Sequence, residues 1–272
     1  MVIKAMSREY LVDRFFGFVP AIQFLPRRNS YFRKLETATA AAELQPYLQT
    51  LKHDGVLVVP DFLPADVVEQ MRAAVPDITE FEQSPEGDRA FMYREAQRLP
   101  AMEPFFESPV ISGLARGYIS RDAIALRRTI GLKTVHGPIP TFEMNYHMDT
   151  WKHRMKAFLY LEDVGPDNAP MVYLKGSHRG RWRYLAEARH FKHFRTDERG
   201  YAENEGVYYL GSFWPHEVAQ LKRDYGYEDL VCTAKAGSVV MFDGRGLHHA
   251  TALNAGRRLI LISYWVHPGD HT

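Results

Sequence analysis

The sequence predicts a mainly β chain with flanking helices (α+β class), folded as an antiparallel jelly-roll barrel. Three observations lead to this prediction. Helical patterns come first in the chain, many short apolar or β-branched runs follow, and Gly- and Pro-containing turns separate those runs. Short strands with such turns after a helical start are typical of a jelly roll that packs helices on one side.

The N-terminal part predicts two helices on either side of a short strand. Residues 37–52 are rich in Ala, Leu and Glu with leucines at helical spacing, and residues 64–75 begin with Pro and Asp before an apolar face. Residues 56–62 between them indicate a buried strand. Residues 80–105 are polar and indicate a loop with a short helix. Residues 15–25 are expected to pack on the core as an arm, with a membrane-surface or lid segment as the alternative.

Strand patterns dominate the remainder of the chain. They cover residues 127–135, 141–146, 155–164, 170–174, 230–232, 238–242 and 257–266. A basic, aromatic-rich insertion, about 175–230, interrupts them. We therefore expect one domain over 1–272, with an N-terminal helical extension (about 1–80) and this insertion.

Composition excludes several classes of protein. The formal net charge is +1, so no whole-molecule field favours nucleic acid or a membrane surface. Cys232 is the only cysteine, which rules out an internal disulfide and a Cys-based zinc cluster and fits a cytoplasmic setting. Charged residues interrupt the apolar N-terminus, so we expect neither a signal peptide nor a transmembrane segment. The expected partner is a small-molecule substrate, and the sequence does not indicate an oligomeric state.

One short stretch carries the chemistry. His147 and Asp149 are two residues apart, so on a strand both side chains would share a face. A His-x-Asp arises often by chance, but an apolar run far downstream ends at His248 and His249. Two His and one carboxylate, with other positions open, form the facial arrangement of non-haem Fe(II) oxygenases. His153 would instead complete a local zinc-like trio.

An arginine follows the second histidine turn. Arg257 stands at the start of the strand pattern GRRLILISYW. A guanidinium facing inward among Leu and Ile needs an anionic partner, because an unpaired buried charge is costly. A bidentate carboxylate would be such a partner.

These motifs together carry a resemblance. The stretches HMDTWKHRMKAFLYLEDVGPDNAPMVYLKGSHR and MFDGRGLHHATALNAGRRLILISYW resemble the phytanoyl-CoA dioxygenase family of Fe(II)/2-oxoglutarate oxygenases. The match covers roughly residues 125–266. The resemblance implies a double-stranded β-helix (jelly-roll, cupin-like) barrel, Fe(II) as cofactor, and 2-oxoglutarate and O2 as co-substrates, with release of succinate and CO2.

Site residues follow from the resemblance by position. His147, Asp149 and His248 resemble the iron ligands, with His249 as the alternative to His248. Arg257 resembles the residue that holds the far carboxylate of 2-oxoglutarate. Arg258 is the alternative to Arg257. Asp149 stands where halogenating relatives have a small residue, so hydroxylation or a related oxidation is the implied outcome.

Further contacts are predicted with structural alternatives left open. Lys156 and Asn145 are candidates for the co-substrate, although a snorkelling lysine and a polar residue satisfied within the sheet fit the same pattern. Arg245, Arg181 and Arg183 are candidates for substrate binding, since loops at a barrel mouth often select the substrate and this one is basic.

The leading interpretation is an Fe(II)- and 2-oxoglutarate-dependent dioxygenase that hydroxylates a small-molecule substrate, and the basic insertion allows that substrate to be anionic. The alternative is a jelly-roll protein that binds a metal or ligand without redox chemistry. That alternative would need neither Arg257 nor 2-oxoglutarate.

Overall fold

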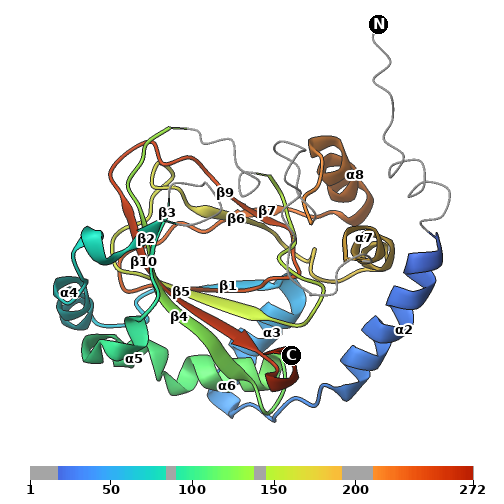
Figure 1. Ribbon diagram of the computed structural model, residues 1–272, viewed down its shortest axis with the longest axis horizontal. Coiled ribbons are helices and arrows are strands. Elements are labelled where there is room, and N and C mark those ends of the chain that lie inside the picture. Colours follow the sequence, from blue (N-terminus) through green and yellow to red (C-terminus); the bar gives the residue numbers. More distant parts are fainter. Residues whose placement is uncertain (1–17, 84–89, 138–144, 192–210, 272) are drawn as a thin grey trace, which may run out of the picture.

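The computed structural model describes residues 18–83, 90–137, 145–191 and 211–271 (Figure 1). Its helices are α2 (Phe18–Lys34), α3 (Gln45–Asp54), α4 (Ala65–Ala73), α5 (Glu103–Phe106), α6 (Pro109–Tyr118), α7 (Trp182–Phe191) and α8 (Pro215–Tyr225). Short 3-10 helices cover Ala42–Leu44, Ile78–Glu80, Ala96–Arg98, Pro100–Met102 and Pro268–His271.

The strands form two sheets. They are β1 (Val56–Val59), β2 (Glu82–Gln83), β3 (Ala90–Tyr93), β4 (Ile124–Lys133), β5 (Met155–Tyr160), β6 (Met171–Leu174), β7 (Asp229–Val231), β8 (Val239–Asp243), β9 (His248–Ala250) and β10 (Arg258–Val266). The larger sheet has the order β1-β8-β5-β10-β4-β3-β2, and the smaller has the order β7-β6-β9. The described pairs of strands in both sheets are antiparallel.

The sheets face each other, and helices cover the outer face of the larger one. Figure 1 shows α3 and α6 beneath that sheet and α2, α7 and α8 at one end of the molecule. Alternate residues of β10 divide between two cores. Leu259 and Leu261 pack with the helices, whereas Ile260 and Ile262 pack between the sheets. This period-two alternation decides which side chains can reach the space between the sheets.

The predicted fold class is confirmed, with differences in detail. Within the described residues the two sheets stay separate and do not close into one hydrogen-bonded barrel. The helix predicted over 37–52 begins later as α3, because Pro46 suits the first turn of a helix. The loop predicted over 80–105 contains β2 and β3, which extend the edge of the larger sheet. The strand predicted over 141–146 lies mostly outside the described residues.

The N-terminal segment packs on the body of the protein through α2. Phe24 is buried and makes an edge-to-face contact with Trp151, with ring centroids 5.3 Å apart. Phe24 thus packs on the core, while residues 15–17 of the predicted arm lie outside the described residues, and the role of the segment stays a prediction. Among the described helices, none combines the length and the apolar character that crossing a membrane requires.

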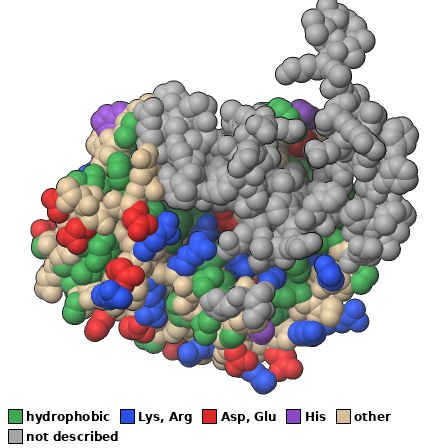
Figure 2. Space-filling view, in the orientation of Figure 1, with side chains coloured by type: hydrophobic (Ala, Val, Ile, Leu, Met, Phe, Trp, Pro, Cys, Tyr) green, Lys and Arg blue, Asp and Glu red, His purple; other side chains and the backbone are tan. Residues whose placement is uncertain are grey.

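Charged side chains of both signs are interspersed over the lower part of the face in Figure 2. That mixture agrees with the near-zero net charge of the sequence. The cytoplasmic setting stays a prediction.

Candidate metal centre

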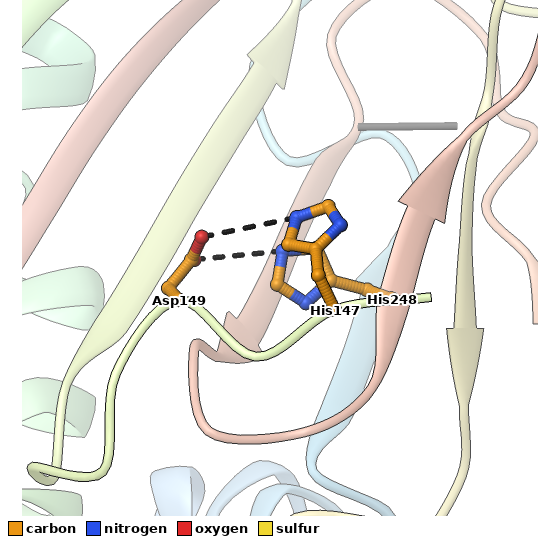
Figure 3. Close-up of side chains that lie close together, drawn as sticks. All are labelled: His147, Asp149 and His248. Carbon is orange, nitrogen blue, oxygen red and sulfur yellow. Dashed lines mark ion pairs between the residues drawn. The ribbon is translucent and has the colours of Figure 1, made fainter. Parts of the chain in front are cut away.

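Three side chains from two distant segments meet between the sheets. His147 and Asp149 come from the segment before β5, and His248 begins β9. His147 Nε2 lies 3.9 Å from Asp149 Oδ1, and His248 Nε2 lies 3.5 Å from Asp149 Oδ2. Figure 3 shows both imidazole rings beside each other and facing the carboxylate. All three side chains are buried, and one ligand atom from each fits within 4.8 Å of the others.

Backbone pairing holds the two segments in register. His147 N donates to His248 O at 3.0 Å, and His248 N donates to His147 O at 3.1 Å. Asp149 N donates to Gly244 O at 2.8 Å. Residues 147–149 are not a regular strand, but these bonds anchor both ends of the tripeptide and place both side chains on one side.

Each histidine is held in one tautomer by a carbonyl. His147 Nδ1 lies 2.8 Å from Asn145 O, and His248 Nδ1 lies 2.9 Å from Gly246 O. A carbonyl oxygen only accepts, so Nδ1 carries the proton in both rings. When such a ring is neutral, its Nε2 presents a lone pair toward the shared space, which is how ligating histidines are usually oriented.

Lys156 forms an ion pair with the carboxylate of this cluster. Its Nζ lies 2.8 Å from Asp149 Oδ2, and its side chain also lies over the rings of Phe242 and Tyr264. β5 places Lys156 on the same face as Phe158, which packs between the sheets. The structure thus brings the predicted Lys156 to the centre, where its contact is with Asp149.

Aromatic rings form one wall of the centre. The His248 ring lies 5.1 Å from the Phe242 ring and 6.2 Å from that of Tyr173, which is nearly parallel to it. Gly246 allows this packing, because a Cβ there would lie only 1.8 Å from Tyr173 Oη. Sequence reasoning did not single out Gly246, Phe242 or Tyr173. The sequence position of an aromatic residue or a glycine does not show which side chain it will contact in the folded protein.

The two alternative histidines lie elsewhere. His249 faces away from His248 along β9, and its ring contacts Tyr146 at 4.5 Å. His153 is mostly buried beside Asp243, its Nε2 lies 3.6 Å from Asp243 Oδ2, and its ring contacts Tyr118. Burial and then the Arg245 guanidinium lower the pKa of His153 to about 3. His153 is therefore neutral at physiological pH.

The two candidate arginines fall on opposite sides of the larger sheet. Arg257 donates through Nε and Nη2 to Glu162 Oε1 at 2.8 and 2.6 Å, and its side chain is 51% exposed. Arg258 is the first residue of β10 and donates to Ala169 O. Its position in the strand puts it on the face of Ile260, between the sheets. Glu162 thus already supplies a carboxylate partner for Arg257, and the choice of the arginine that would meet 2-oxoglutarate stays a prediction.

The remaining predicted residues are also placed. Asn145 supplies the carbonyl that fixes His147. Arg245, Arg181 and Arg183 come together around one cavity. Among the described residues that line this cavity, none belongs to the metal centre.

Arg245 is committed to a buried carboxylate. It binds Asp243 through Nε at 3.1 and 3.0 Å and through Nη2 at 2.6 Å, and Tyr118 Oη donates to the same carboxylate at 2.7 Å. Burial alone would raise the pKa of Asp243, but Arg245 and His153 hold it well below the usual range. This cluster supports the turn that leads to His248.

Comparison with known proteins agrees with this picture. A protein-family model described as phytanoyl-CoA dioxygenase (PhyH) matches residues 51–259. A search of curated proteins finds no match.

Solved structures share the fold at low identity. The epimerase SnoN, in complex with Fe3+, alpha ketoglutarate and nogalamycin RO, has 20% identity and a TM-score of 0.56 over 83% of this chain and 84% of its own. EctD from S. alaskensis with 2-oxoglutarate and 5-hydroxyectoine has 16% identity and a TM-score of 0.57 over 87% and 80%. HygX from Streptomyces hygroscopicus with nickel and 2-oxoglutarate has 16% identity and a TM-score of 0.53 over 85% and 88%. At such identities the likeness shows the fold.

Proposed function

The chain belongs to the phytanoyl-CoA dioxygenase family of Fe(II)- and 2-oxoglutarate-dependent oxygenases, and we propose that it hydroxylates a small molecule at a metal held by His147, Asp149 and His248. The observation that carries the proposal is the convergence of two Nε2 lone pairs and one carboxylate in a buried space. Two imidazoles and a carboxylate with open positions suit non-haem Fe(II).

The donor geometry fits an iron-sized ion. Adjacent ligands at about 2.1 Å from a metal, with angles near a right angle, are about 3 Å apart. The two His–Asp separations of 3.9 and 3.5 Å exceed this by less than an ångström. Small rotations of the side chains would close the gap. Carbonyl partners already hold both imidazoles in the ligating tautomer.

Lys156 would position the carboxylate ligand. With its ammonium 2.8 Å from Oδ2, it favours an ionised Asp149 and leaves Oδ1 to face His147. Asp149 bound through one oxygen would leave more of the coordination sphere open to a co-substrate. Contact of Lys156 with a co-substrate carboxylate is compatible with this position.

Arg258 would hold the far carboxylate of 2-oxoglutarate. It lies on the strand face that points between the sheets, and its guanidinium is charged at all physiological pH values. Arg257 would play no part, because it is bound to Glu162 and half exposed.

The bound iron, with O2 and 2-oxoglutarate, would supply the oxidant, and succinate and CO2 would be released. The chain itself would orient the ligands and exclude bulk water, through the buried position of the cluster and the rings of Phe242 and Tyr173 beside His248. Hydroxylation is proposed because Asp149 occupies the ligand position that a halide would need.

Succinate formation tests the proposal. Purified protein loaded with Fe(II) is incubated aerobically with 2-oxoglutarate, first alone and then with a panel of small molecules, and succinate is measured. We expect slow uncoupled formation with wild type and none with His147→Ala. Faster succinate formation together with a product heavier by one oxygen atom would identify a substrate. A protein that binds one metal ion yet never consumes 2-oxoglutarate would instead support the non-redox jelly-roll alternative.

A further inference from the structure

A basic cavity of about 880 Å³ lies outside the space between the sheets. Its walls come from the C-terminal half of α2, the end of α3, the end of α6, His153, residues within 178–184, and Arg245. We call it the α2 cavity. Its size is in the range of small-molecule sites in proteins.

Three of the cations that line the α2 cavity are paired with buried carboxylates. Arg28 and Arg183 both bind Glu187, which is fully buried, and Arg183 also donates to Ser177 O at 2.7 Å. Arg245 binds Asp243. These pairs fix the walls, because breaking a buried ion pair leaves an uncompensated charge.

Four further cations line the cavity. Arg33, Lys52, Arg179 and Arg181 are exposed, and within the described residues none of them has an ion pair with a carboxylate. Among the described residues, seven Lys and Arg side chains thus stand against the two carboxylates of the paired set, which leaves an excess of five positive charges. The whole chain has a net charge of only +1, so the positive charge is concentrated at this cavity.

Two histidines also line the cavity. Burial is the main cause that lowers the pKa of His153 to about 3 and of His178 to about 4, and the Arg245 guanidinium lowers both further. Both rings are therefore neutral at physiological pH. They add no charge to the excess carried by the Lys and Arg side chains.

We propose that the α2 cavity binds a small molecule that carries two or more phosphate groups. A diphosphate brings about three negative charges and several acceptor oxygens, which suits a group of guanidiniums and an ammonium better than a single carboxylate does. The four cations without carboxylate partners would contact the phosphates, while the paired arginines shape the wall. This site is additional to the proposed oxygenase function and needs neither metal nor 2-oxoglutarate.

The cavity and the metal centre lie on opposite sides of the turn at Asp243, Gly244 and Arg245. Arg245 holds Asp243, and the next carbonyl along the chain, Gly244 O, accepts a hydrogen bond from Asp149 N at 2.8 Å. The predicted substrate candidates Arg245, Arg181 and Arg183 all belong to the cavity side of this turn. The ligand would therefore bind behind the metal centre.

Calorimetric titration of the full-length, metal-free protein with inorganic pyrophosphate tests the proposal at about 0.15 M salt. We expect one site per chain, and at least tenfold weaker binding for the double variant Lys52→Glu, Arg181→Glu. Both side chains are exposed, so the variant should fold. The control is the single charge reversal Lys235→Glu. Lys235 is exposed, pairs with Asp163 and does not line the cavity, so this variant should bind as wild type does.

Four outcomes would overturn the proposal. They are no binding at millimolar pyrophosphate, equal weakening in the Lys235→Glu control, equally tight binding of citrate, and competition by saturating 2-oxoglutarate. The last would assign the cavity to the co-substrate. Success or failure of the oxygenase proposal is read separately, from succinate formation, so the two ideas can fail independently.

Discussion

Replacing Arg258 and Arg257 one at a time should separate the co-substrate arginine from its neighbour. Arg258→Ala removes a guanidinium from the space between the sheets, and Arg257→Ala removes one that is 51% exposed and bound to Glu162. The two variants lose the same side chain at adjacent positions. Each is therefore the control for the other.

The magnitudes follow from the two environments. Removing one partner of a desolvated, hydrogen-bonded charge pair costs about 2–5 kcal/mol of binding, and about 3 kcal/mol corresponds to roughly 150-fold in Kd. An exposed pair such as Arg257–Glu162 contributes about 0.2–1 kcal/mol to stability. We therefore expect at least about 30-fold weaker 2-oxoglutarate binding in Arg258→Ala. In Arg257→Ala, binding should change less than twofold.

Binding is measured by calorimetry with Mn(II) in place of iron under nitrogen, so that no turnover occurs. Arg258 also donates to Ala169 O, so the thermal midpoint of each variant is measured to exclude misfolding. Arg258→Lys keeps the positive charge but loses the bidentate geometry of the guanidinium, so its affinity for 2-oxoglutarate should lie between those of Arg258→Ala and wild type. Weak binding in Arg257→Ala with normal binding in a folded Arg258→Ala would refute the strand-face reasoning.

Three further predictions concern the same region. His248→Ala should lose tight Fe(II) binding while His249→Ala keeps it, which is checked by metal analysis of the dialysed proteins. The opposite result would assign the ligand to His249. Gly246→Ala should lower the free energy of unfolding by about 1–3 kcal/mol in urea titrations, because its Cβ would meet the buried Tyr173 Oη, and an unchanged midpoint would contradict that contact. The pKa of His153 is about 3 when folded and about 6.5 when unfolded, so the unfolded chain takes up a proton first as the pH falls. Stability should therefore decrease below pH about 6.5, by up to about 1.4 kcal/mol per pH unit from this group, and the decrease should be shallower in His153→Gln.

The three residues of the metal centre could be predicted from the sequence, because their spacing and their position next to strand patterns are visible in it. His147 and Asp149 are spaced for one face, and the histidine turn follows an apolar strand. The structure brings these residues together, although the tripeptide is held by isolated bridges and not within a regular strand.

The choice between Arg257 and Arg258 could not be made from sequence. Neighbouring residues of a strand face opposite ways, so an error of one residue reverses the assignment. An alternating hydrophobic pattern would normally resolve this, but β10 is almost wholly buried on both faces. The run RLILISYWV therefore carries no alternation that marks the inner side.

The α2 cavity could not be predicted from the sequence either. Its lining comes from segments between Arg28 and Arg245 that are far apart in sequence, and only folding brings them together. The basic residues of the predicted insertion were visible in the sequence. Their neighbours Arg28, Arg33 and Lys52 carried no pattern that linked them to it.

The most direct test of the central claim is anaerobic titration of the metal-free protein with Fe(II) and then 2-oxoglutarate, followed by visible absorption. A keto acid chelated to Fe(II) gives a metal-to-ligand charge-transfer band, and no substrate is needed. We predict a band that saturates at one Fe(II) and one 2-oxoglutarate per chain and is absent in His147→Ala. Folded wild-type protein that binds Fe(II) but develops no band would contradict the account.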